Sequence, residues 1–370
     1  MRKAARHLVE TMLEQAGVTP GGNAPWDIRI HDDRLYDRVL CDHNLGLGEA
    51  YVEGWWDCPR IDAFISRVLA ARVTDRLSGN LKLLLKALPA YLFNNQTRRK
   101  AGKVARVHYN LGNDLFLAFL DSYLQYSCAY FQDTDDLEIA QRNKMDLICR
   151  KLELAPGDHV LDIGCGWGGL AKYMAEEYGC RVTGVNISDK QIEYARTWCR
   201  SLPVTIEKKD YRDVRGTFDK IVSVGMFEHV GAKNYRTFMR KVDSLLADKG
   251  IFLLHTIGGN APNLRCDPWI TTYIFPNGML PAIGQIARAC EGIFVVEDWH
   301  NIGPHYDPTL LAWHKRFIDH WDSLSSTYGQ AFKRMWEYYL LSCAGAFRAR
   351  DIQVWQVLMT RKGRTQPVCR

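Results

Sequence analysis

The sequence predicts an α/β protein with a doubly wound sheet and a smaller, mainly helical region in front of it. Two observations carry this prediction. Short apolar runs alternate with helical stretches from about Lys151 onward, and the first of these runs leads into a glycine-rich turn. The length of 370 residues, with 47% hydrophobic and 24% charged residues, is typical of a globular protein with one large and one smaller domain, or with two of similar size.

The first part of the chain is predicted to hold short helices and loops. An amphipathic helix that carries Leu8, Leu13 and Ala16 opens it. Leu81, Leu84, Leu85 and Leu88 recur at the spacing i, i+3, i+4 and i+7, which places them on one helical face. Pro89 should end or kink that helix, because proline lacks the backbone N–H that a helix interior needs.

The remainder of the chain supplies the strands and helices of the sheet. Segments near residues 169–178, 189–201 and 234–247 are predicted as helices between strands, and residues 309–347 form a long, largely helical stretch. Seven strands are expected, at residues 159–163, 181–187, 204–207, 218–224, 251–257, 293–296 and 352–359.

The net charge of +6 is concentrated in the first third of the chain. Residues 1–110 hold 17 Lys+Arg against 12 Asp+Glu, and a basic run at 98–106 lies in a predicted linker, residues 94–107. Such an excess indicates an anionic partner. A basic run beside an apolar helix face is typical of an element that binds an anionic phospholipid bilayer, although a solvated helix face explains it equally well. No reader motif accompanies the basic residues, so we do not expect a nucleic-acid partner.

The cysteines and the apolar runs indicate where the protein works. Eleven cysteines are scattered without a C-x-x-C pair, and residues 1–18 do not read as a secretory signal. Free thiols without export information fit the reducing cytoplasm, and zinc-ligand spacings are absent, so no metal is expected. No run reaches the roughly 20 apolar residues that a membrane span needs. We therefore expect a cytoplasmic protein that meets the inner face of a membrane peripherally.

The strongest local signal is the glycine turn in residues 160–169, VLDIGCGWGG. A predicted strand runs into it and a predicted helix follows. Gly164, Gly166 and Gly168 allow the backbone to approach a ligand where side chains would collide. Together with Gly169, the first two also satisfy the looser G-x-G-x-x-G dinucleotide pattern, so the turn alone does not decide which cofactor binds.

The residues around the turn favour S-adenosylmethionine over a nicotinamide dinucleotide. The second strand ends in residues 182–188, VTGVNIS, without the acidic residue that a nicotinamide enzyme uses for its ribose. Asp162 stands two residues before the first glycine, and an Asp210-Tyr211 pair follows the third strand. This combination fits the Rossmann-like sheet of a class I S-adenosylmethionine methyltransferase.

Eight segments of the chain carry a family resemblance. They are GLGEAYVEGWWDC (46–58), HYNLGNDLF (108–116), YSCAYF (126–131), VLDIGCGWGG (160–169), GMFEHVG (225–231), LLHTIG (253–258), YIFPNG (273–278) and CAGAFRARDIQVWQ (343–356). Together they resemble the cyclopropane-fatty-acyl-phospholipid synthases, which are relatives of the mycolic acid cyclopropane synthases. The first segment is similar to the bacterial phospholipid enzymes in particular.

The resemblance implies a reaction and a set of cofactor-binding residues. A methylene unit would pass from S-adenosylmethionine to a cis double bond of a phospholipid acyl chain, giving a cyclopropane ring and S-adenosylhomocysteine. The implied ligands are Tyr126, Ser127, Gly164 and Gly166 for the methionine portion, Asn186, Ile187 and Gln191 for the ribose, and Asp210 and Tyr211 for the adenine. Asp162, Cys165, Trp167 and Gly168 complete the set in the glycine turn.

The chemistry also needs a base, because ring closure removes a proton from the newly added methyl group. The resemblance implies a bound bicarbonate ion for this role. Its implied ligands are Cys128 and Ile257, mainly through their backbones, together with Glu228, His255 and Tyr306, the last in a predicted loop. From the residues alone, Cys128 can equally be an ordinary buried cysteine, and Glu228 with His255 a satisfied core hydrogen bond. Both of the latter follow apolar strands, where α/β sheets place ligands.

Cys343 is a further candidate, since the family resemblance includes a cysteine in the CAGAF segment. Cyclopropanation needs no covalent bond between protein and substrate, and a thiolate close to a sulfonium would risk its own methylation. We therefore expect Cys343 to be a site residue without a nucleophilic role.

The expected organisation has three parts. Residues 1–93 form a small helical domain for lipid docking and dimerisation, residues 94–107 a basic linker, and residues 108–370 the catalytic domain. A homodimer is implied by the resemblance. Two other functions stay open: a fatty-acyl phospholipid C-methyltransferase that gives a methyl-branched or methylene chain, and a non-catalytic lipid-binding protein on a methyltransferase scaffold.

Overall fold

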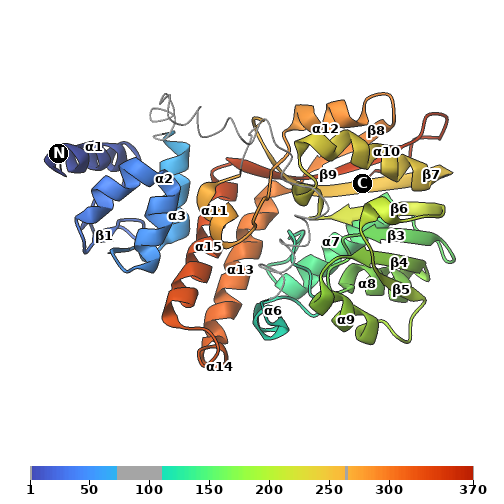
Figure 1. Ribbon diagram of the computed structural model, residues 1–370, viewed down its shortest axis with the longest axis horizontal. Helices are drawn as coiled ribbons and strands as arrows, with labels where there is room; N and C mark the ends of the chain where they lie inside the picture. The colour runs from blue at the N-terminus through green and yellow to red at the C-terminus, as the bar shows by residue number, and fades with distance from the viewer. Residues whose placement is uncertain (1, 73–110, 263–265, 370) are drawn as a thin grey trace.

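The computed structural model describes residues 2–72, 111–262 and 266–369 (Figure 1). The predicted helix at 81–88 and the predicted linker at 94–107 lie outside these residues. At the centre is one sheet of seven strands, the number that the sequence predicts, and their order is β5-β4-β3-β6-β7-β9-β8. Its strands are β3 (His159–Ile163), β4 (Arg181–Asn186), β5 (Val204–Lys208), β6 (Phe218–Val224), β7 (Leu246–Gly259), β8 (Val295–Asn301) and β9 (Ile352–Thr360).

The strands differ in direction and in how closely their bounds match the prediction. The five strands from β5 to β7 are parallel to their neighbours, whereas β9 runs antiparallel to both β7 and β8. β3 and β6 have the predicted bounds, while β8 begins two residues later than predicted and continues to Asn301. As the edge strand, β8 leaves Val295 and Val296 exposed and includes polar residues, so its apolar signal is weak.

Helices cover both faces of the sheet. α7 (Leu137–Lys151) and α8 (Gly169–Tyr178) share one apolar cluster with Val160 of β3. α10 (Tyr235–Leu245) and α12 (Ile283–Cys290) share a second with Leu161. Consecutive residues of β3 therefore point to opposite layers, as expected for a strand that is buried on both sides. α9 (Asp189–Trp198) packs beside β5, where Ile192 and Ile206 belong to a third small cluster.

A helical layer stands beside the sheet and connects it to the N-terminal part of the chain (Figure 1). It contains α6 (Asn113–Phe119), α11 (Pro268–Tyr273), α13 (Tyr306–Asp319), α14 (Trp321–Leu324) and α15 (Gln330–Arg348). The N-terminal residues form α1 (Arg2–Gln15), α2 (Arg34–Val52), α3 (Ile61–Ala70) and a small sheet of β1 (Arg29–Ile30) and β2 (Trp56–Asp57). One continuous apolar cluster runs through these helices, from Leu13 of α1 to Phe347 of α15.

The buried face of α1 corrects one expectation. Leu13 and Ala16 are buried as predicted, but Leu8 is 45% exposed and Val9 takes its place in the core. The spacing of Val9, Leu13 and Ala16 is i, i+4 and i+7, which follows one stripe of the helix, whereas Leu8 lies about 100° round from Val9.

Two further observations concern the cysteines and the lengths of the helices. All eleven cysteines are free thiols, and six of them are buried. Among the residues that the structure describes, no helix combines the length and apolar character needed to cross a bilayer.

Candidate active site

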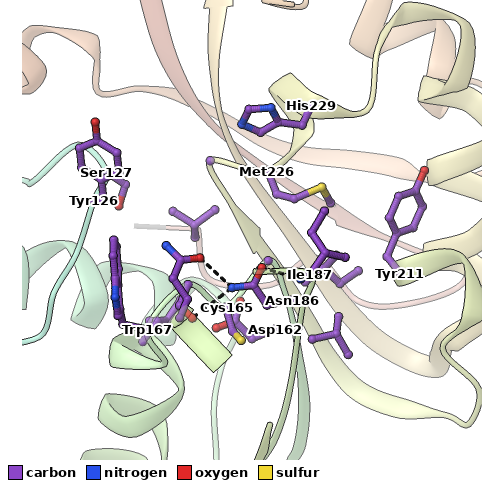
Figure 2. A pocket seen from close by; sticks show the side chains of 18 of the residues that line it. Tyr126, Ser127, Asp162, Cys165, Trp167, Asn186, Ile187, Tyr211, Met226 and His229 are labelled. Carbon is purple, nitrogen blue, oxygen red and sulfur yellow. Dashed lines mark hydrogen bonds between the residues drawn. The ribbon is translucent and has the colours of Figure 1, made fainter. Parts of the chain in front are cut away.

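A pocket opens at the carboxyl ends of β3, β4 and β6 (Figure 2). This is the edge at which open α/β sheets bind ligands. Twelve of the thirteen residues predicted to bind the cofactor line it: Tyr126, Ser127, Asp162, Gly164, Cys165, Gly166, Trp167, Asn186, Ile187, Gln191, Asp210 and Tyr211. We call this the cofactor pocket. Figure 2 shows Tyr126 and Ser127 on one side and Tyr211 on the other.

The glycine turn forms the floor of the cofactor pocket. Gly164, Gly166 and Gly168 have φ angles of 89°, 55° and 85°, in the left-handed region that favours glycine. A Cβ atom on Gly164 would lie 2.8 Å from the Cβ of Met226, whereas one on Gly166 would meet nothing within 4 Å. Gly168, the one predicted residue outside the lining, caps the N-terminus of α8. The turn is thus a close-fitting cradle that leaves room above Gly166, which suits the methionine portion of S-adenosylmethionine.

Asp162 is the buried acid of the cofactor pocket. Its side chain comes from β3, and its Oδ2 atom has no hydrogen-bond partner within the described part of the chain. Burial raises the pKa of this carboxyl to about 7, while the nearby Lys144 ammonium opposes the shift. An unsatisfied buried carboxylate beside the pocket is suited to a cationic or hydrogen-bond-donating part of a ligand.

Two amides take the position that an acid occupies in nicotinamide enzymes. The Nδ2 of Asn186 donates to Oε1 of Gln191 at 2.9 Å and to the Gly166 carbonyl at 3.2 Å, and its Oδ1 accepts from the backbone N–H of Ile187 at 2.7 Å. Gln191 is buried at the start of α9. Their mutual bonds fix both amides at the end of β4, where they can exchange hydrogen bonds with ribose hydroxyls.

The Asp210-Tyr211 pair closes the far side of the cofactor pocket. Asp210 begins a short helical turn, η1 (Tyr211–Asp213), and its two carboxylate oxygens accept from the Arg212 guanidinium at 2.8 and 2.5 Å. Tyr211 packs edge-on against Phe238, with ring centroids 5.2 Å apart. The Tyr211 ring is therefore held rigidly, and it offers an adenine an aromatic surface.

The near wall of the cofactor pocket is the segment 124–127. The hydroxyls of Tyr126 and Tyr339 lie 2.9 Å apart, and Trp167 donates from Nε1 to Asn113 at 3.1 Å. Behind the wall, the buried ammonium of Lys144 donates to Gln125 and to Ser127. The segment continues directly into Cys128, the first of the second group of predicted residues.

That second group, which we call the buried cluster, consists of Cys128, Glu228, His255, Ile257 and Tyr306. Glu228 follows β6, and its Oε1 accepts from the backbone N–H of Ile257 at 2.7 Å. Its Oε2 is buried and has no hydrogen-bond partner among the described residues. Burial raises the pKa of Glu228 to about 7, and the hydrogen bond from the Ile257 backbone partly opposes the rise.

His255 lies on β7, two residues before Ile257, so both side chains point to the same face of the sheet. The imidazole is buried, and Nδ1 lies 3.5 Å from Nε2 of Gln356 on β9. Burial lowers the pKa of His255 to about 3, and the charges of Lys144 and Lys151 add to this effect. The ring is therefore neutral at physiological pH and can both donate and accept one hydrogen bond.

Tyr306 lies near two other members of the buried cluster, Cys128 and Glu228. It is the first residue of α13, not a loop residue as predicted, because the 3-10 turn η4 (Gly303–His305) leads straight into the helix. Burial raises the pKa of its hydroxyl well above the usual value, and the nearby Cys128, Tyr126 and Glu228 add to the rise. The hydroxyl thus stays protonated and available as a donor.

The two cysteines in this region are both protonated at neutral pH. Cys128 is fully buried, and its thiol donates to the Ala129 carbonyl at 3.2 Å. Cys343 lies on α15, and the nearby Cys266 and Asp267 reinforce the effect of burial on its pKa. Burial raises the pKa of both thiols strongly, so neither is a thiolate, the form that acts as a nucleophile.

Sequence reasoning missed several residues of the site. Met226 and His229 line the cofactor pocket, Met226 just before η2 (Phe227–His229) and His229 at its end, and their place soon after β6 is a signal that would have found them. Lys144 was missed because a single lysine in a helix is ordinarily exposed. Its signal is the buried stripe of α7, in which Gln141, Lys144 and Ile148 recur at helical spacing. The other lining residues that were missed are Leu124, Gln125, Ile163, Leu170, Val185, Lys209, Arg212, Val224, Gly225, Val230 and Asn277.

Comparison with known proteins identifies the family. The family described as mycolic acid cyclopropane synthetase matches residues 96–357. The chain belongs to this family. It is 53% identical to the cyclopropane-fatty-acyl-phospholipid synthase of Escherichia coli strain K12, over 96% of this chain and 93% of that protein. It is also 33% identical to the tuberculostearic acid methyltransferase UfaA1 of Mycobacterium tuberculosis, over 98% of this chain and 90% of that protein.

Solved structures of the cyclopropane synthase family support the assignment of the cofactor. Mycolic acid cyclopropane synthase CmaA1, complexed with SAH and CTAB, superposes with a TM-score of 0.66 at 32% identity, over 70% of this chain and 98% of that one. The protein is thus an S-adenosylmethionine-dependent methyltransferase of the cyclopropane synthase family. In the residues that the structure covers, no group of three or more His, Cys, Asp or Glu side chains could hold a metal ion.

Proposed function

We propose that this cyclopropane synthase family member converts unsaturated phospholipid acyl chains into cyclopropane chains, with a bicarbonate ion as the ring-closing base. S-adenosylmethionine supplies an electrophilic methyl group when bound. The observation that carries the proposal is the Glu228 carboxylate, which has one oxygen fixed by Ile257 and the other buried without a partner in the part of the chain that the structure describes. That arrangement is suited to receiving a ligand or a proton at a defined atom.

The cofactor pocket would hold S-adenosylmethionine in extended form across the sheet edge. The methionine end would rest on Gly164 and Gly166, with Asp162 beneath it and Tyr126 and Ser127 at its side. The ribose would meet Asn186 and Gln191, and the adenine would meet Tyr211. Tyr126 and Ser127 would then lie beside the methionine end of the cofactor, and the chain continues from them into Cys128 of the buried cluster.

The buried cluster would hold bicarbonate and dispose of the proton. The Tyr306 hydroxyl and neutral His255 can each donate one hydrogen bond to an anion, and backbone groups of Cys128 and Ile257 complete the ligand set. Bicarbonate would supply the base there, and Oε2 of Glu228, which has no hydrogen-bond partner among the described residues, would be placed to accept the proton that ring closure releases. Burial of the cluster keeps water away from the carbocation that methyl transfer leaves on the acyl chain.

A second outcome is methyl transfer without ring closure. It is favoured by one observation, the 33% identity to a protein named as a tuberculostearic acid methyltransferase. Both outcomes share the cofactor and the first bond-forming step. They differ in whether a base stands ready to remove a proton from the new methyl group, and the complete buried cluster favours ring closure.

One experiment separates these products. Purified protein is incubated with S-adenosylmethionine and vesicles of unsaturated phospholipid, and the acyl chains are analysed by mass spectrometry and proton NMR. High-field cyclopropyl methylene signals support the proposal, and a branched methyl signal supports the second outcome. Unchanged chains would point to a non-catalytic lipid-binding protein.

We further propose that the protein works peripherally on the inner face of an anionic membrane, as a homodimer with an N-terminal docking domain (residues 1–93). Residues 1–72 hold nine Lys+Arg and eleven Asp+Glu, whereas residues 73–110 hold eight and one. The cationic excess of the first third therefore comes from 73–110, which includes the predicted leucine face and the linker at 94–107. This charge distribution assigns bilayer contact chiefly to that segment.

A further inference from the structure

We propose that Lys144 is a positioning residue of this enzyme, which fixes the wall segment Gln125–Ser127 of the cofactor pocket. The inference deepens the proposed function and rests on it, because it assumes that this wall binds the cofactor. Lys144 does not line the cofactor pocket. Within the described residues, its hydrogen bonds go to Gln125 and Ser127 and not to the predicted ligands of bicarbonate. It would act through Gln125 and Ser127.

The contacts of Lys144 point directly at the wall. Its side chain comes from the middle of α7 and is fully buried. The ammonium donates to Oε1 of Gln125 at 2.5 Å and to Oγ of Ser127 at 3.0 Å. These two acceptors flank Tyr126, whose ring lines the cofactor pocket. One cation thus holds the side chains on both sides of the residue that faces the cofactor.

A second residue of the same helix secures the backbone of the wall. Gln141, one turn before Lys144, donates from Nε2 to the carbonyls of Gln125 at 3.3 Å and of Ser127 at 3.0 Å. Lys144 and Gln141 therefore bind the same two residues, one through their side chains and the other through their backbones. This double attachment fixes the position of Tyr126 between them more firmly than either bond alone.

The charge of Lys144 reaches both halves of the site. The titratable groups that face it are Asp121, Cys128, Asp162 and His255. Asp121 accepts from the backbone N–H groups of Tyr123 at 2.9 Å and Gln125 at 2.8 Å, so it shapes the same wall from the other side. Asp162 lies in the floor of the cofactor pocket, and Lys144 is the cation that favours its ionised form.

The energetic cost of this arrangement argues for a role beyond folding. A buried ammonium is expensive to desolvate, so its hydrogen bonds and nearby charges must offset that cost. Both hydrogen bonds of the Lys144 ammonium go to the pocket wall, to Gln125 and Ser127. Removing its charge should therefore disturb cofactor binding more than it disturbs stability.

The test measures S-adenosylhomocysteine affinity by calorimetry for Lys144→Met, Lys144→Gln, Ser127→Ala and the double variant Lys144→Met/Ser127→Ala. Lys144→Met should lose affinity by about tenfold or more, because it removes two charge-assisted hydrogen bonds. Lys144→Gln, which retains a donor, should recover part of the loss. If Lys144 acts through Ser127, the double variant should be little weaker than Lys144→Met alone, a non-additivity that general destabilisation does not produce.

Two controls separate a specific effect on cofactor affinity from a general loss of charge or of folding. Lys315→Met removes an exposed lysine of α13 and should leave affinity unchanged. Thermal unfolding identifies a variant that has lost its fold, in which case Lys144→Gln carries the test. Affinities of Lys144→Met and Lys144→Gln within twofold of the wild type would overturn the inference, as would full additivity in the double variant. Failure of the wild type to form cyclopropane would refute the proposed function instead, since the Lys144 result is read from cofactor affinity and not from product.

Discussion

The Oε1 atom of Glu228 accepts a hydrogen bond of 2.7 Å from the backbone N–H of Ile257. This contact joins the turn after β6 to the end of β7, the two strands that also pair Val224 with His255. It fixes the carboxylate in place and leaves its other oxygen, Oε2, buried and without a partner in the described residues. The Glu228 carboxylate is therefore held in one orientation, in which Oε2 is the atom that can accept a proton or a hydrogen bond.

Replacing Glu228 by Gln should impair turnover far more than cofactor binding. The amide can still accept the Ile257 hydrogen bond through its carbonyl, but it cannot take up a proton from the reaction. We expect turnover to fall about 100-fold or more, the range of a lost general base. Cyclopropane formation on vesicles and S-adenosylhomocysteine affinity are the two measurements. Glu14→Gln, at an exposed acid of α1, is the matched control. Normal turnover, or a loss confined to cofactor affinity, would contradict the role assigned to Glu228.

The pH dependence of turnover should report the same carboxylate. Burial raises the pKa of Glu228 to about 7, so the ionised form that accepts a proton is lost as the pH falls through 7. We expect turnover at saturating S-adenosylmethionine to decline below about pH 7 and to level off above it. Saturation matters because Asp162, with a pKa also raised to about 7, should affect cofactor binding over the same range.

The stability of the protein should move in the opposite direction. Because the folded pKa of Glu228 exceeds its unfolded value, the folded state holds an extra proton between about pH 4.5 and 7. The contribution of Glu228 to the free energy of unfolding is therefore favourable below this range and is lost as the pH rises through 7. In Glu228→Gln, this part of the pH dependence should vanish from both turnover and stability. A wild-type turnover that stays constant from pH 8 to pH 5.5 would contradict the assignment.

Replacing Cys343 by Ser should preserve most of the activity. Burial raises the pKa of the thiol strongly, so it is protonated at neutral pH and is not a nucleophile. Serine keeps a similar size and can keep a hydrogen bond, so we expect turnover within about threefold of the wild type, the scale of a small packing change. Cys41→Ser, at an exposed thiol, is the control. Complete loss of turnover in a folded Cys343→Ser variant that still binds S-adenosylhomocysteine would show that the thiol takes part in the reaction.

Much of the fold was accessible from the sequence because its central strands are buried on both faces. The runs that became β3 and β6 are apolar and bounded by turn residues, so pattern alone fixed their limits. The predicted bounds of the edge strand β8, residues 293–296, differ from the observed Val295–Asn301 because an exposed edge strand needs fewer apolar residues. The small strands β1 and β2, of two residues each, are too short to leave a pattern.

The candidate site divides along similar lines. The glycine turn was readable because left-handed φ angles demand glycine, and the motif keeps them close together in the chain. The buried cluster needed the family resemblance, since Cys128, Glu228 and Tyr306 come from distant segments that only the fold brings together. Lys144 was not predicted because its role depends on burial, and burial of a lysine is decided by tertiary packing.

Replacing Gly345 by Ala should destabilise the junction between α3 and α15. A Cβ atom there would lie 2.5 Å from the Asp62 carbonyl oxygen and 2.9 Å from the Cβ of Ile65. Backbone atoms of a packed helix cannot move aside cheaply, so we expect a loss of about 1–3 kcal/mol in the free energy of unfolding. Urea unfolding measures it. Gly329→Ala, where a Cβ would meet nothing within 4 Å, is the control. Equal stability of the two variants would show that the helices pack less closely than this geometry requires.

Binding to anionic vesicles should depend on the cations of residues 73–110. This segment holds eight Lys+Arg and one Asp+Glu, so attraction to a negative bilayer should be worth roughly 1 kcal/mol for each cation near the surface. We expect Arg98→Ala/Arg99→Ala/Lys100→Ala to weaken vesicle binding strongly, with little effect on S-adenosylhomocysteine affinity. Raising the salt concentration should weaken vesicle binding of the wild type for the same reason, because ions screen exposed charges.

The control for this prediction removes three exposed lysines from the sheet part of the molecule, as Lys233→Ala/Lys249→Ala/Lys362→Ala. It lowers the net charge by the same amount, so it separates a local effect from a general one. Vesicle sedimentation at several salt concentrations measures both variants. If the two triple variants lose vesicle affinity equally, net charge and not the 73–110 segment governs membrane binding. If neither loses it, contact with the bilayer is mainly apolar, and the leucines between residues 81 and 88 become the next residues to replace.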